Sequence, residues 1–146
     1  MKQVTLFLAL SGIMLFSCSK ENSYKATTGT LQGSWKMIMV ADNASGITSI
    51  KPAGLQADVA ITFHAINAAS GTLYGHTPTN HISESSYETG VNGQLHIPAL
   101  AMTKLAETSW GQEFVINIRS SETYKLTSNG NLVIITAEKT LTFQPQ

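Results

Sequence analysis

The sequence has few residues of the kinds on which common protein chemistries depend. Its 146 residues include one cysteine, Cys18, which excludes an intramolecular disulfide and a cysteine-rich metal site. Only 12% of the residues are charged, and nine basic residues balance nine acidic ones. Nucleic acids and membrane surfaces attract proteins through clustered positive charge, so we expect no nucleic-acid partner and no polybasic membrane contact.

The sequence also lacks an apolar run that would cross a bilayer comfortably as a helix. Its most apolar run, Val4–Phe16, follows the positive charge of Lys2 and is typical of the core of a secretory signal peptide. At its end, Leu15-Phe16-Ser17-Cys18 resembles a bacterial lipobox, in which a small residue precedes a cysteine that is lipidated and becomes the mature N-terminus. We predict a lipoprotein signal peptide over residues 1–17 and lipidation of Cys18. The alternative is an ordinary secretory signal with a chance cysteine.

A lipidated cysteine would determine where the protein is held. Buried acyl chains contribute about 0.8 kcal/mol per CH2, so two or more of them form a durable anchor without a membrane-spanning helix. Residues 18–30 would then be the lipidated cysteine and a polar, flexible tether. We predict an outer-membrane, lipid-anchored protein of the cell envelope, on the periplasmic or the surface face. Its only membrane contact would be the anchor.

Removal of residues 1–17 leaves 129 of the 146 residues, enough for one domain with a proper core, which we place at 31–146. The overall composition, 42% hydrophobic, is that of a globular chain. Near its start, the domain contains Gly33-Ser34-Trp35, a pattern typical of small antiparallel barrels in which the indole plugs one end. A strand is expected to continue through Val40, and residues 42–55 are expected to form a surface loop.

The middle of the chain carries the clearest strand pattern. Asp58–His64 alternates between apolar and polar residues, which predicts a strand with Val59, Ile61 and Phe63 facing inward. An Asn92-Gly93 pair predicts a type I′ hairpin turn. The further strands expected in this region are Gly71–Gly75, His81–Thr89 and Gln94–Ile97, with a bend at His76–Asn80.

A helix is predicted from Trp110 to about Ser120. Trp110, Phe114 and Ile118 recur at helical spacing, and Ser109 with Gln112 has the spacing of a capping box. The alternative is a strand over Phe114–Ile118, because β-branched residues alternate there.

Three strands are expected to follow, at Thr123–Thr127, Asn131–Thr136 and Thr140–Phe143. The middle strand is apolar on both faces, which predicts that both are covered. Together the elements predict a mainly β (α+β) fold, a small antiparallel, barrel-like β-sheet with one helix packed on it.

From Leu31 to Phe143 the chain carries a set of residues in a characteristic order: Leu31, Gly33, Trp35, Ile61, Thr62, Phe63, Gly71, Asn80, Tyr87, Leu95, Thr103, Glu113, Phe114, Tyr124, Leu132, Leu141, Thr142 and Phe143. These residues and the order of the expected elements resemble the META domain, also called HslJ-like, of bacterial lipoproteins and secreted proteins. The family often has Gly-Cys-Asn where this chain has Pro78-Thr79-Asn80, and Thr-x-x-Ala-Cys where it has Thr103 to Glu107, so both cysteines are absent here. The resemblance implies an envelope protein tied to stress or antibiotic tolerance, with no catalytic residues to carry over.

No motif in the sequence indicates catalysis or a cofactor. No serine lies in a Gly-x-Ser-x-Gly nucleophile elbow. Glu84 and Glu88 are expected to lie together on the solvent-exposed face of one strand. No metal-binding motif includes a histidine, although His76 and His81 flank the Pro78 bend and are able to approach each other. We therefore predict no enzyme, no cofactor and no metal. The four histidines are His64, His76, His81 and His96.

Two functions of different classes remain. The first is a binding or scaffold module linked to envelope stress, which contacts another envelope protein. The alternative is a lipocalin-like carrier of a small apolar ligand. A filled core with an exposed apolar patch favours the module. An apolar cavity of about 300 Å3 or more, lined by Phe63, Tyr74, Met102 or Trp110, favours the carrier.

Overall fold

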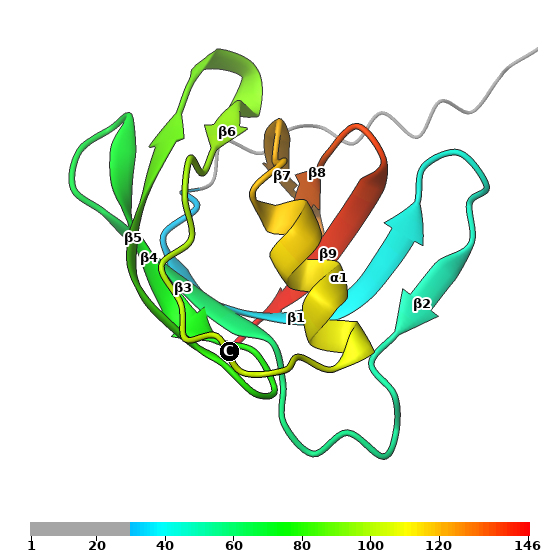
Figure 1. Ribbon diagram of the computed structural model, residues 1–146. Coiled ribbons are helices and arrows are strands. Elements are labelled where there is room, and N and C mark those ends of the chain that lie inside the picture. The colour runs from blue at the N-terminus through cyan, green and yellow to red at the C-terminus, as the bar shows by residue number, and fades with distance from the viewer. Residues whose placement is uncertain (1–29) are drawn as a thin grey trace, which may run out of the picture.

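The computed structural model describes residues 30–146, in which antiparallel strands curve into a nearly closed barrel with one α-helix (Figure 1). This confirms the predicted mainly β fold. The strands are β1 (Gly33–Asp42), β2 (Thr48–Ile50), β3 (Ala60–Ala65), β4 (Ser70–His76), β5 (His81–Thr89), β6 (Leu95–His96), β7 (Thr123–Leu126), β8 (Leu132–Ile135) and β9 (Lys139–Pro145). The helix α1 spans Ser109–Ile118, and a short 3-10 turn, η1, spans Val91–Gly93.

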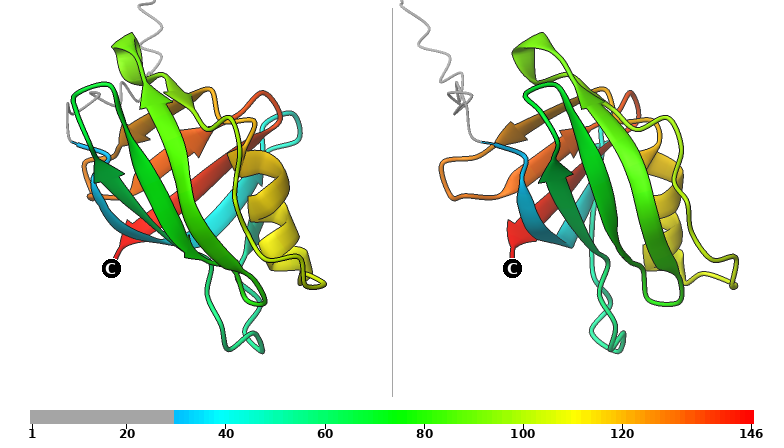
Figure 2. Two further views of the ribbon diagram at one scale, coloured as in Figure 1. Left: turned by 60° about the vertical axis from the view of Figure 1, so that its left-hand side comes forward. Right: turned by 90° about the vertical axis from the view of Figure 1, so that its left-hand side faces the viewer.

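The nine strands form one sheet with the order β6-β5-β4-β3-β1-β9-β8-β7, and β2 pairs with β1 beside this path. Figure 2 shows β3, β4 and β5 side by side on one side of the barrel. The two ends of the sheet meet, because Gln94 and Thr123 form an isolated bridge and the Leu95 N–H donates to the Glu122 carbonyl at 3.0 Å. The chain thereby leaves few unpaired strand edges.

Side chains fill the inside of the barrel. Val59, Ile61 and Phe63 all lie in the core, which confirms their predicted inward face. The rings of Phe63 and Tyr87 meet edge to face with centroids 5.1 Å apart. A small barrel of this kind has room for side chains and little else. The largest fully buried side chains are Phe63, Phe114, Phe143, Met37, Ile61, Leu73, Ile82, Leu95, Ile97, Ile118, Leu132 and Ile134.

Trp35 belongs to this core. Its indole is buried, and its Nε1–H donates to the Leu31 carbonyl at 3.0 Å. The indole has one donor, and the chain supplies a partner for it four residues earlier. Trp35 therefore has the structural role that the sequence predicted.

The helix α1 lies against the inner face of the sheet, in front of β1 and β9 (Figure 1). Trp110, Phe114 and Ile118 are buried as predicted, and Phe114 meets Phe143 of β9 edge to face at 6.3 Å. The strand alternative for Phe114–Ile118 is wrong. A strand would have placed Phe114, Ile116 and Ile118 on one face, whereas the helix buries Phe114 and Ile118 and leaves Ile116 64% exposed.

The start of α1 differs from the prediction by one residue. Thr108 and not Ser109 caps the helix, and its Oγ1 accepts from the Gly111 N–H at 3.1 Å. The Gln112 N–H bonds instead to the Thr108 carbonyl at 2.8 Å, as the first turn of a helix requires. Both neighbouring hydroxyls are good caps, so their spacing alone did not decide between them.

The expected loop over residues 42–55 contains a strand. β2 pairs with the end of β1, with Met39 opposite Ile50, and all three of its residues are exposed. The strand was missed because it buries neither face, so no alternation of apolar and polar residues marks it. The Asn92-Gly93 turn has the expected geometry, since both residues have positive φ, 58° and 75°.

The strands after α1 follow the prediction. β8 lies between β7 and β9, and on its two faces Leu132, Val133 and Ile134 are buried while Ile135 is partly exposed. Within residues 30–146 no helix has the length and apolar character needed to cross a bilayer. The predicted signal peptide, Cys18 and all but the last residue of the predicted tether lie outside the described residues.

Candidate functional site

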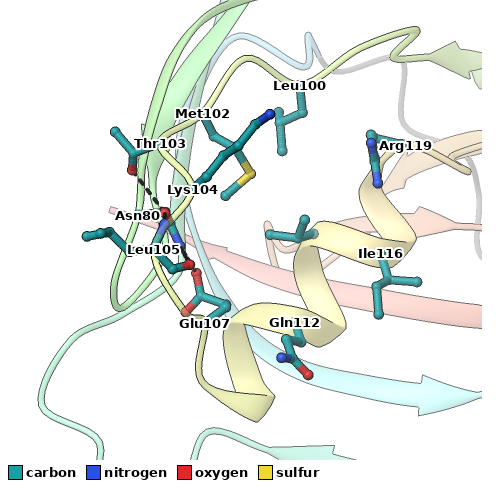
Figure 3. Close-up of a pocket in the computed structure, with 11 residues that line it drawn as sticks. Asn80, Leu100, Met102, Thr103, Lys104, Leu105, Glu107, Gln112, Ile116 and Arg119 are labelled. Carbon is teal, nitrogen blue, oxygen red and sulfur yellow. Dashed lines mark hydrogen bonds between the residues drawn. The ribbon is translucent and has the colours of Figure 1, made fainter.

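A groove of about 330 Å3 runs between α1 and the segment 98–108, which connects β6 to α1 (Figure 3). We call it the α1 groove. Apolar side chains come from both walls, Leu100, Met102 and Leu105 from the connecting segment and Val115 and Ile116 from α1. The polar residues that line it are Asn80, Thr103, Lys104, Glu107, Gln112 and Arg119.

The connecting segment is attached to β5 by main-chain hydrogen bonds. The Ser83 N–H donates to the Ala101 carbonyl at 2.9 Å, and the Thr103 N–H donates to the His81 carbonyl at 3.0 Å. Between them Met102 forms a bridge with Ile82. These contacts extend the pairing of the sheet into a segment that is otherwise irregular, and they position one wall of the groove.

The side chain of Asn80 fixes the lower part of the same wall (Figure 3). It lies in the bend between β4 and β5 and is only 4% exposed. Its Oδ1 accepts from the Leu105 N–H at 2.7 Å and from the Thr103 hydroxyl at 3.0 Å. Its Nδ2 donates to the Leu105 carbonyl at 3.0 Å and to Glu107 Oε2 at 2.9 Å. One amide therefore satisfies both the donor and the acceptor of the Leu105 main chain.

The carboxylate of Glu107 completes this network. Its Oε2 also accepts from the Thr77 hydroxyl, and its Oε1 accepts from the Thr108 N–H at 2.9 Å. Burial alone would raise the pKa of Glu107, but hydrogen bonds from Thr77, Asn80, Thr79 and Thr108 outweigh it and hold the pKa below its usual value. The carboxylate stands just before α1, where the positive end of the helix dipole also favours a negative charge.

Replacing Glu107 by glutamine is expected to lower the free energy of unfolding by about 2 kcal/mol at pH 7, because it removes charge-assisted hydrogen bonds. The pKa of Glu107 is lower in the folded chain than its ordinary value of 4.5, so the carboxylate stabilises the fold fully above that pH. This stabilisation is lost as the pH falls through the folded pKa. Urea unfolding followed by tryptophan fluorescence at a series of pH values measures the difference.

The matched control is Glu84→Gln, which removes an exposed carboxylate of β5. It is expected to change stability by less than about 0.5 kcal/mol at every pH. A constant gap between the Glu107→Gln variant and the parent chain down to low pH would contradict the assigned role of the carboxylate.

The free charges of the α1 groove are positive. Lys104 and Arg119 both line it, and among the described residues neither takes part in an ion pair. Glu107 is the one carboxylate in the lining, and its two oxygens already accept hydrogen bonds from Thr77, Asn80 and Thr108. The groove thus combines an apolar lining with two cations that are available to a ligand.

The structure does not gather the histidines. All four are exposed, although His76 and His81 are opposite each other in the β4–β5 pair, as their spacing around Pro78 suggested. Among residues 30–146 no group of three or more histidine, cysteine or carboxylate side chains is arranged to hold a metal ion. Glu84 and Glu88 are both exposed on β5.

The residues expected to line a ligand cavity are separated. Met102 lines the α1 groove, whereas Phe63 and Trp110 are buried in the core and Tyr74 is 47% exposed on β4. Sequence reasoning therefore missed the groove itself and the roles of Asn80 and Glu107. No local signal was available, since Asn80 and Glu107 are 27 positions apart in segments without regular periodicity.

The chain matches no protein-family model, no curated protein and no solved structure.

Proposed function

We propose that the protein is a lipid-anchored, non-catalytic binding module of the bacterial cell envelope, and that the α1 groove is its binding surface. One observation carries the proposal. The interior of the barrel is filled by core side chains, whereas an apolar groove lies open at the surface between two elements. At its margins Leu105 is 66% exposed and Ile116 is 64% exposed. Large apolar side chains grouped at the surface are typical of binding sites.

The chemistry of the groove supports binding over catalysis. Nucleophilic catalysis needs an activated serine, cysteine or similar group beside a base. Among the described residues that line the groove there is no histidine, serine or cysteine, and the one carboxylate is held by hydrogen bonds. The resemblance to the META domain supports a place in the envelope and a link to envelope stress. The lipobox at Cys18 supports an outer-membrane anchor.

The second candidate is a carrier of a small apolar ligand. A volume of about 330 Å3 is at the small end of the range of ligand pockets, about 300–1,000 Å3. The site differs from that of a lipocalin, because it lies between a helix and a connecting segment and not inside the barrel. Both candidates place the occupant in the same groove.

The experiment compares the accessibility of two engineered cysteines in membranes from cells that produce the full chain. In an Ile116→Cys variant we expect slow reaction with a water-soluble maleimide, because an occupant covers the groove, and faster reaction after the protein is purified. The control is Val91→Cys, which is 76% exposed in η1 and outside the α1 groove, and it is expected to react equally in both states.

Equal reactivity of the two cysteines in membranes would contradict a binding role for the groove. The anchor is tested in the same cells by metabolic labelling with palmitate. The parent chain is expected to incorporate the label, and a Cys18→Ser variant is expected to incorporate none. Incorporation by the Cys18→Ser variant would show that the lipobox assignment is wrong.

A further inference from the structure

We propose that the α1 groove binds a small amphipathic monocarboxylate, whose apolar chain lies on the lining of the groove and whose carboxylate lies at Lys104 and Arg119. This inference rests on the proposed function, because it names the chemical class of the occupant. Its three supports are the apolar lining, the sign of the free charge and the rigidity of one wall.

The apolar lining comes from two sides. Leu100, Met102 and Leu105 line the groove from the connecting segment, and Val115 and Ile116 line it from α1. A ligand with an apolar body would cover Leu105 and Ile116 and release the water that contacts them. A purely polar ligand would gain nothing from this surface.

The free charge selects the sign of the polar group. In Figure 3 Lys104 and Arg119 lie toward the end of the groove near Leu100, and Glu107 and Gln112 lie toward the other end. Because the Glu107 oxygens accept hydrogen bonds from within the protein, they do not compete for these cations. An anionic group at the Leu100 end would therefore meet two cations and no free carboxylate of the groove.

The size and rigidity of the groove favour a small molecule over a segment of protein. Asn80 holds the Leu105 main chain by two hydrogen bonds, of 2.7 and 3.0 Å, and the sheet holds Ala101 and Thr103. A site with a pre-formed wall and a volume of about 330 Å3 is typical of small-ligand pockets. A fatty-acid-like monocarboxylate satisfies the volume, the apolar lining and the charge together.

The experiment uses membranes from cells that produce the full chain and a photoreactive decanoate that carries a diazirine in its acyl chain. After irradiation we expect the label on peptides that contain residues 100–119. Added decanoate is expected to compete with the probe, and decan-1-ol, which has the same chain without the charge, is expected to compete more weakly.

Variants test the two cations. Lys104→Gln and Arg119→Gln are each expected to weaken competition by decanoate about three- to fivefold, the size of effect of one exposed charge pair. Arg119→Lys keeps the charge and is expected to retain most of the labelling. The matched control is Lys36→Gln, which removes a cation of β1 that is outside the groove. Resistance to trypsin in the same membranes reports that each variant is folded.

The outcomes separate this inference from the proposed function. If decan-1-ol competes as well as decanoate, or if the charge variants label like the parent chain, the carboxylate assignment is overturned and the binding role stands. If Ile116→Cys is protected in membranes but the probe labels no groove peptide, the occupant is a different molecule and the inference falls. If neither protection nor labelling is seen, both proposals fall.

Discussion

Asn80→Ala is expected to lower the free energy of unfolding by about 3 to 4 kcal/mol, because it removes one side chain that makes hydrogen bonds to four residues, Thr79, Thr103, Leu105 and Glu107. The substitution leaves the N–H and the carbonyl of Leu105 without their partners, together with the Thr103 hydroxyl, and it withdraws a donor from Glu107. A buried polar group that loses its partner costs about 1–3 kcal/mol, and these groups, which are partly buried, are expected to cost toward the lower end of that range each. Urea unfolding followed by tryptophan fluorescence measures the loss.

The matched control is Asn129→Ala, which truncates an exposed asparagine in the turn between β7 and β8. It is expected to change stability by less than about 0.5 kcal/mol. A loss of less than about 1 kcal/mol for Asn80→Ala would show that the connecting segment does not depend on this amide. Since the same hydrogen bonds hold a wall of the α1 groove, Asn80→Ala is also expected to reduce labelling by the photoreactive decanoate.

Gly75→Ala is expected to cost about 3 kcal/mol or to prevent folding, because the added methyl group has no space. Gly75 lies in β4 opposite Ile61 of β3. A Cβ atom at this position would collide with the Ala60 carbonyl oxygen and would lie 2.9 Å from the Ile61 Cα atom. Both are main-chain atoms of a paired strand, so relief requires β3 and β4 to move apart.

The matched control is Gly54→Ala in the segment between β2 and β3. A Cβ atom there has no neighbour within 4 Å, and the residue does not have a positive φ. It is expected to leave the thermal midpoint unchanged or to raise it slightly, because alanine restricts the unfolded chain. Equal midpoints for Gly54→Ala and Gly75→Ala would contradict the close approach of β3 and β4.

The fold was largely predictable because its elements are amphipathic. In β3, apolar and polar residues alternate with a period of two, and in α1 the apolar residues Trp110, Phe114 and Ile118 lie along one stripe. Each pattern indicates which face is buried. β2 was missed because its three residues are all exposed. The predicted cap of α1 was one residue away from the observed one, because Thr108 and Ser109 offer equivalent hydroxyls.

The candidate site was less predictable for a different reason. Asn80 and Glu107 are 27 positions apart, and neither lies in a local motif that implies the other. Their contact depends on the way in which the segment 98–108 returns alongside β5. A hydrogen-bond network between irregular segments has no periodicity, so composition and spacing do not reveal it. The groove likewise forms only where α1 and the segment 98–108 lie side by side, so neither segment alone predicts it.

The sequence by itself determined which residues enter the core of this protein, where most strands and the helix lie, and that they make a small antiparallel barrel with one helix. Those properties follow from local patterns of apolar and polar residues. Only the tertiary structure decided that the barrel interior is filled and that an apolar, positively charged groove forms outside it, between α1 and the segment 98–108. The physical reason is that a groove belongs to the space between elements, and this space depends on contacts between residues distant in the chain.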